Sequence, residues 1–168
     1  MNIYYLAFFS LFLLFSCNND ASESFELELK RLDTLFVSNP TNVSFEDYAS
    51  DYGDFWQIYT ENVINLTSDS FSESLINFQQ EKDFAKPYKE IIDQYQDFSP
   101  QLKNLSRAFY YYNEAFPDKV IPEIITFFGG FNYVAIATDS VLGIGLEMFL
   151  GNNSYYSKLV HKFPKYMH

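Results

Sequence analysis

Cys17 is the residue with the clearest possible chemistry in this 168-residue sequence, because it is the only cysteine. A lone cysteine rules out an intramolecular disulfide framework. Residues 14–17 read Leu-Phe-Ser-Cys, with a small residue directly before the cysteine. This pattern is similar to the bacterial lipobox, in which the cysteine is acylated and becomes the mature N-terminus. We therefore expect a lipid on Cys17, with palmitate among its acyl chains. The alternative is a free thiol in an ordinary signal peptide that is cleaved elsewhere.

The segment before Cys17 has the character of an export signal. Residues 3–15 form an apolar run, and polar residues 18–20 follow the cysteine at once. A helix of this length is too short to cross a bilayer but suits the apolar region of a signal peptide. We expect residues 1–16 to be a signal peptide and residues 17–22 to be the lipid anchor and a short linker. More than one acyl chain would make membrane attachment stable.

A second candidate site lies in residues 141–150. From residue 142 on, every second residue is large and apolar, and the residues between them include two glycines. In a strand, this alternation predicts that the apolar side is buried. The opposite side carries Gly143, Gly145, Glu147 and Phe149. Glycine in a strand often marks a close approach by another backbone or a ligand, so this side is a possible partner-binding face. The alternative is that one of the chain's own helices packs closely against the glycines.

The sequence contains no further motif for catalysis or metal binding. Its two histidines, His161 and His168, belong to no His-Glu-x-x-His pattern, and no serine lies in Gly-x-Ser-x-Gly. Acidic residues follow helix faces, and EF-hand spacing is missing. We therefore predict no catalytic, cofactor-binding or metal-binding residue. This favours a protein without enzyme activity, although it does not decide the question.

The charge of the chain excludes two classes of partner. Its formal net charge is -11, with a pI near 4.4 and scattered lysines. Binding to nucleic acid requires clustered Lys and Arg, and so does attachment to an anionic membrane surface. We predict neither.

Helical periodicity dominates residues 24–116. Apolar residues recur at spacings of three and four in five segments, which predicts amphipathic helices. The second begins at Ser44 as N-cap and runs to Val63, the fourth has Pro87 at its first position, and the fifth opens at Ser99. The first and fifth apolar stripes consist of Phe25, Leu29, Leu32 and Phe36, and of Leu102, Leu105, Phe109, Tyr112 and Phe116.

Residues 117–151 change to a strand pattern. The runs 124–128, 131–138 and 141–150 are rich in β-branched and aromatic residues, and Gly129-Gly130 and Asp139-Ser140 separate them. We predict three antiparallel strands. The expected fold class is α+β, a single mostly helical domain over residues 23–168 in which the helices pack on this small sheet.

The lipobox, the helical first part, the run 116–151 and the closing Phe-Pro-Lys-Tyr-Met-His together resemble the gliding-motility lipoprotein GldB family of Bacteroidota. The most specific portions are residues 116–122, 130–133 and 139–151. The resemblance implies a cell-envelope lipoprotein required for gliding, attached to the outer membrane through Cys17 and working with proteins of the gliding and type IX secretion apparatus. It supplies no biochemical activity. Family members continue with further helices, so we expect the chain to be truncated at its C-terminus.

A second resemblance gives the alternative function. The helical lead and the Gly-Ile-Gly-Leu of residues 143–146 are similar to exported zinc-peptidase-like domains, in which an edge strand aligns an extended peptide. The metal motif expected after such a strand is missing from residues 155–161. The alternative is therefore a peptidase-like hydrolase or a degenerate peptidase domain that binds a peptide along its edge strand.

Overall fold

The computed structural model describes residues 24–37 and 44–151, and it is an α+β fold, as predicted. Five α-helices come before most of the sheet in the described chain. They are α2 (Phe45–Tyr52), α3 (Asp54–Ile58), α4 (Phe71–Gln80), α5 (Lys82–Gln94) and α6 (Ser99–Ala115). The strands are β1 (Leu29–Arg31), β2 (Glu123–Phe127), β3 (Ala135–Ala137) and β4 (Val141–Gly145). Shorter helical turns are η2 (Leu32–Val37), η4 (Tyr59–Ile64), η5 (Ser68–Ser70) and η6 (Leu146–Phe149).

The sheet has four strands in the order β1-β2-β4-β3, and it is mixed rather than antiparallel. Ile124 of β2 lies between Leu29 and Leu142, and both neighbours run parallel to it. Only β3 is antiparallel, with Ile136 opposite Gly143. The prediction of three antiparallel strands was therefore wrong, although the turn at residues 139–140 does join the antiparallel pair β3 and β4. The run after β2 forms a loop that lets β4 return beside β2 in the same direction.

The first predicted helix is also wrong. Residues 24–28 have no regular secondary structure, β1 follows, and η2 is a 3-10 helix. Pairing with β2 makes this segment a strand rather than a helix. The first hydrogen bond of the parallel pair runs from the amide of Ile124 to the carbonyl of Glu28, at 2.9 Å. The residues also alternate with a period of two, and Leu27 is buried between exposed Glu26 and Glu28.

Local signals placed two of the helix starts correctly. The Ser44 hydroxyl accepts hydrogen bonds from the amides of Glu46 and Asp47 at the start of α2. Ser99 opens α6, with proline in its first turn. The single helix predicted from Ser44 to Val63 is interrupted, because Gly53 has φ +52° and separates α2 from α3.

The predicted fourth helix begins earlier than expected. Lys82 is the first residue of α5, the side chain of Glu81 caps it, and Pro87 lies inside the helix rather than at its first position. Pro87 therefore does not mark the start of the helix. The helix tolerates the loss of one backbone amide donor at this position.

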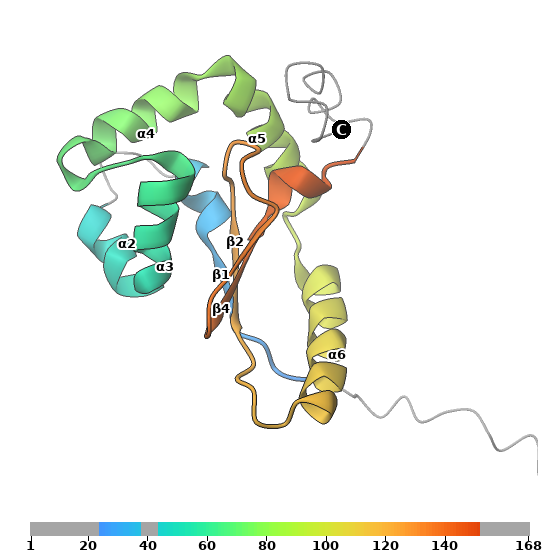
Figure 1. Ribbon diagram of the computed structural model, residues 1–168. Helices are drawn as coiled ribbons and strands as arrows, with labels where there is room; N and C mark the ends of the chain where they lie inside the picture. Colours follow the sequence, from blue (N-terminus) through green and yellow to red (C-terminus); the bar gives the residue numbers. More distant parts are fainter. Residues whose placement is uncertain (1–23, 38–43, 152–168) are drawn as a thin grey trace, which may run out of the picture.

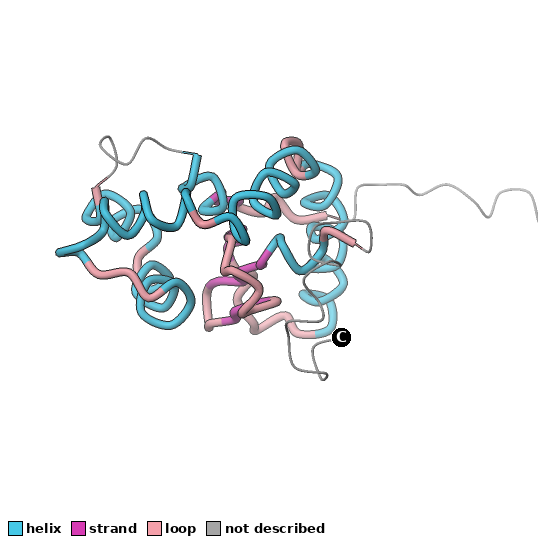
Figure 2. Tube along the Cα trace, turned by 90° about the horizontal axis from the view of Figure 1, so that it is seen from above, coloured by secondary structure: helices cyan, strands magenta, loops and turns pink. Residues whose placement is uncertain are grey.

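Figure 1 shows α2 and α3 on one side of the sheet and α6 on the other, with α5 passing over the end of the strands, and Figure 2 shows the helices around the strands from above. On the side of α3, four aromatic rings contact one another in stacked, tilted and edge-on pairs, with ring centroids 5.8 to 6.4 Å apart: Phe55, Trp56, Tyr59 and Phe127. These rings are almost fully buried, and they form the centre of the core. No helix among the described residues has the length and apolar content needed to cross a membrane.

The stripe of α6 is covered only in part. Leu102, Leu105 and Phe109 are half-buried, whereas Tyr112 and Phe116 are exposed. The prediction that the helices pack on the sheet through their apolar stripes is therefore wrong for the last turn of α6 and for Phe116, which follows it.

Candidate functional site

The four predicted face residues do not lie on one strand face. Strand β4 ends at Gly145, and Glu147 and Phe149 belong to the 3-10 helix η6, so the predicted strand over residues 141–150 is too long. Gly143 and Gly145 are buried, Glu147 is 1% exposed and Phe149 is 51% exposed. Cys17 lies outside the described residues. The structure thus separates a buried part of the predicted face from one exposed aromatic ring.

The two glycines allow close packing by the chain itself. A Cβ atom on Gly143 would lie 2.6 Å from the ring of Phe55 in α3. A Cβ atom on Gly145 would overlap the carbonyl oxygen of Tyr133, because the Gly145 amide donates to Val134 at 3.0 Å and draws that segment close. Strand β4 is also paired on both sides and is not an edge strand. Binding of a partner at these glycines stays a prediction, and it would require Phe55 to move.

Glu147 connects η6 to the loop that follows β2. Its Oε1 accepts a hydrogen bond from the amide of Gly129 at 2.8 Å and another from the amide of Phe131 at 3.1 Å. Its buried Oε2 has no hydrogen-bond partner in the part of the chain that the structure describes. Burial raises the pKa of the Glu147 carboxyl to about 7, although the two amides act in the opposite direction. Both protonation states are therefore populated near neutral pH.

A second hydrogen bond holds the same loop. The hydroxyl of Tyr59 donates to the carbonyl of Phe128 at 2.7 Å. Within the loop, Gly130 and Phe131 both have positive φ, +63° and +69°. This left-handed turn is uncommon for phenylalanine. The amide of Phe131 lies in this turn, and its hydrogen bond to Glu147 stabilises the turn.

A buried carboxyl with a raised pKa, such as that of Glu147, suits proton transfer in an active site. However, Glu147 lines neither of the two cavities described below.

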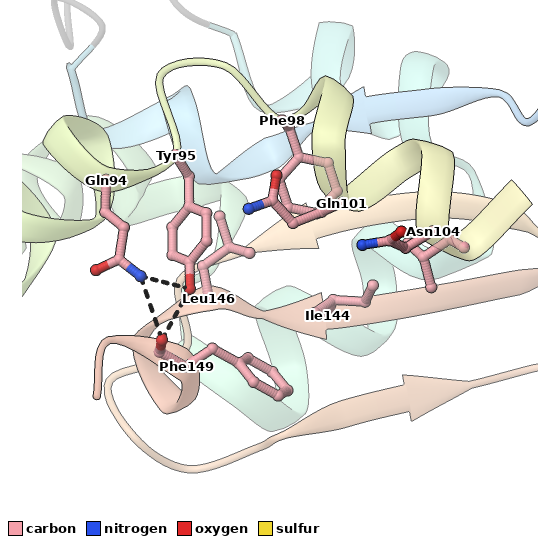
Figure 3. A pocket seen from close by; sticks show the side chains of 9 residues that line it. Gln94, Tyr95, Phe98, Gln101, Asn104, Ile144, Leu146 and Phe149 are labelled. Atoms are coloured by element: carbon pink, nitrogen blue, oxygen red, sulfur yellow. Dashed lines mark hydrogen bonds between the residues drawn. The ribbon is translucent and has the colours of Figure 1, made fainter. Parts of the chain in front are cut away.

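The first cavity is an apolar groove of about 450 Å³ between α6 and the sheet. Figure 3 shows Gln101 and Asn104 of α6 across from Ile144, with the ring of Phe149 at one end. The groove is lined by Gln94, Tyr95, Phe98, Gln101, Asn104, Leu105, Ile144, Leu146 and Phe149.

Hydrogen bonds fix the end of the groove that η6 forms. The Tyr95 hydroxyl donates to the carbonyl of Phe149 at 2.8 Å, and the Gln94 amide donates to the same carbonyl at 3.3 Å. The buried Oε1 of Gln101 accepts no hydrogen bond from any described residue. A groove with apolar walls and a few amides suits the binding of a nonpolar group, with a hydrogen bond to orient it.

The second cavity, of about 520 Å³, is polar and lies at the opposite end of the strands. One ion pair crosses it. Lys30 approaches the Glu123 carboxylate at 2.8 Å and donates to the carbonyl of Asp51 at 2.8 Å. These contacts join β1 to β2 and to α2.

Sequence reasoning missed the main buried charge. Asp33 is fully buried, and its two carboxylate oxygens accept from Arg31 at 2.8 and 2.7 Å. Thr126 of β2 donates to the same carboxylate, and the Tyr88 hydroxyl donates to the Asp33 carbonyl at 2.7 Å. The bond to Asp33 raises the pKa of the Arg31 guanidinium. The scarcity of arginine was the one available signal, because only two occur in the chain. The cluster joins η2 to β2 and α5.

Over the described residues, no group of three His, Cys, Asp or Glu side chains is placed to hold a metal ion. His161 and His168 lie outside those residues. Among the described residues, the groove beside α6 is the surface best suited to binding.

Comparison with models of protein families identifies a family for the chain. The model of the family described as "Gliding motility protein GldB" matches residues 16–168. Searches of curated proteins and of solved structures gave no match.

Proposed function

Because the chain belongs to the GldB family of gliding motility lipoproteins, we propose that it is a non-catalytic accessory or assembly factor of the gliding apparatus. The observation that carries this proposal is the family match, which begins one residue before Cys17 and runs through both the helices and the sheet. The proposal includes an association with the type IX secretion machinery, whose proteins would be its partners.

Anchoring at Cys17 is the second part of the proposal. The apolar run of residues 3–15 directs export, and acylation of Cys17 then holds the protein on a membrane of the cell envelope. We place it on the outer membrane. A tethered domain of this kind can act on neighbouring envelope proteins without spanning the bilayer itself.

A non-catalytic role is supported by how the described polar groups are used. Asp33 is paired with Arg31, and Glu147 accepts two amides of its own chain. The groove beside α6 has mainly apolar and amide side chains rather than a nucleophile with an adjacent base. These features favour binding over bond cleavage. The alternative, a hydrolase or degenerate peptidase, stays a prediction, and an assay of the purified protein for bound zinc separates the two.

Complementation of gliding tests the proposal. In a strain that lacks the protein, the wild-type chain should restore gliding, and the Cys17→Ser chain should not, although it accumulates to the same level. Glu114→Gln, a change on the exposed side of α6, is the matched control and should restore gliding. Full gliding with Cys17→Ser would contradict an anchored role. Recovery of gliding or secretion proteins with the intact lipoprotein would identify its place in the apparatus.

A further inference from the structure

Four apolar or aromatic side chains at the end of α6 are exposed together. We call them the α6 aromatic patch: Tyr111, Tyr112, Phe116 and Val120, which are 49%, 38%, 54% and 66% exposed. The ring centroids of Tyr112 and Phe116 lie 5.1 Å apart, and the amide of Lys119 donates to the Phe116 carbonyl at 3.0 Å, which closes a turn directly after the helix. Several exposed apolar side chains within one short segment indicate a contact with another molecule or a membrane.

The described N-terminal segment is held beside this patch. The Phe25 amide donates to the Ser106 carbonyl at 3.4 Å, and the Ser106 hydroxyl donates to the Phe25 carbonyl. The ring of Phe25 lies 6.4 Å from that of Tyr110, which precedes the patch directly. Figure 1 shows this segment passing the lower part of α6 before it enters β1.

The length of chain to the proposed anchor limits how far the patch can be from the bilayer. Cys17 precedes Ser24 by seven residues, so even a fully extended chain covers about 25 Å. The helical rise from Ser106 to Phe116 adds only about 15 Å along α6. In contrast, α4 with its exposed Ile76 lies on the other side of the sheet. The chain that leads from Cys17 thus enters the described structure at Phe25, next to the patch.

We propose that the α6 aromatic patch rests on the lipid bilayer to which Cys17 is anchored. The inference depends on the anchored function proposed above. Tyrosine and phenylalanine suit the headgroup region, because their rings enter the apolar layer while a tyrosine hydroxyl stays hydrated. Exposed Glu114 and Asp118 and the net charge of -11 favour a zwitterionic surface over an anionic one. This contact would hold the other end of α6, with Gln101 and the groove, away from the membrane.

The test uses the full acylated chain in phosphatidylcholine vesicles. Acylation of Cys17 leaves an introduced cysteine as the only free thiol, so an environment-sensitive dye can be attached at Val120→Cys, which keeps all three rings of the patch. Ile76→Cys on α4 is the matched control. We expect a blue shift and quenching by nitroxide lipids at position 120, with quenching several-fold stronger than at position 76. Replacing Tyr111, Tyr112 and Phe116 by serine should abolish the shift while thermal melting stays unchanged.

Each outcome has a separate meaning. A protein that floats with the vesicles but shows the same aqueous emission at positions 120 and 76 overturns the membrane contact alone. A shift at position 120 that needs added envelope proteins, and does not occur with lipid, assigns the patch to a protein partner and overturns lipid as its occupant. Failure of the intact chain to float at all removes the anchor, and the proposed function and this inference then fall together.

Discussion

Replacement of Glu147 by glutamine should remove a pH dependence of stability that the buried carboxyl creates. The pKa of Glu147 is about 7 in the folded protein, against an ordinary value of 4.5, because burial disfavours the charged form. In the range from about pH 4.5 to 7 the folded protein keeps this proton while the unfolded chain releases it. The free energy of unfolding must therefore fall as the pH rises through this window.

The size of the effect follows from the shift in pKa. One unit corresponds to about 1.4 kcal/mol, so the full shift is equivalent to about 3 kcal/mol, of which about 2–3 kcal/mol should appear between pH 5 and pH 8. Glutamine stays neutral and keeps one oxygen to accept from the amides of Gly129 and Phe131. Its amide group can shift the overall stability, but by the same amount at every pH.

Urea unfolding of the non-acylated chain at pH 5, 6, 7 and 8 measures this difference. Trp56 is the only tryptophan and is buried in the core, so its fluorescence reports unfolding. The wild type should lose stability over this series more steeply than Glu147→Gln, and Glu114→Gln, as the matched control, should follow the wild type. Equal slopes for the wild type and Glu147→Gln would refute the reasoning that burial controls this carboxyl.

Two further predictions concern the packing of the sheet. Gly143→Val should lower the free energy of unfolding by about 1–3 kcal/mol, because its Cβ would collide with the ring of Phe55. Ala137→Val on the exposed strand β3 should change it by less than about 0.5 kcal/mol, and similar thermal melting of the two variants would contradict the packing. Asp33→Asn should cost about 3–5 kcal/mol in urea unfolding, since it leaves Arg31 without its buried partner. A loss below about 1 kcal/mol would show that this pair is dispensable.

Local chemistry explains which parts of the fold were predictable. Ser44 caps the helix that follows it, and Ser99 is the first residue of α6 with proline next to it, so capping and proline rules were sufficient. Strand β1 was missed because its partner Ile124 is far away in the sequence, and only that pairing selects strand over helix. A residue spacing compatible with both structures cannot decide between them.

The same limit applies to the candidate site. The glycines at 143 and 145 indicated a close approach, but the approaching group, Phe55, comes from a separate helix. Glu147 was expected on a strand face, yet two loop amides hold its carboxyl inside the fold. The groove combines the end of α5, one side of α6 and η6. The stripe of α6 predicted an apolar face without showing how much of it the fold would cover.

Mass spectrometry of the mature N-terminus from the cell envelope tests the central claim most directly. If the protein is a lipid-anchored gliding factor, its first residue is Cys17, with acyl chains attached, and the protein stays in the membrane fraction. The Cys17→Ser chain should then be unprocessed or released from the membrane, and cells that carry it should not glide. An unmodified Cys17, or a mature chain that begins elsewhere in cells that glide normally, would contradict the account.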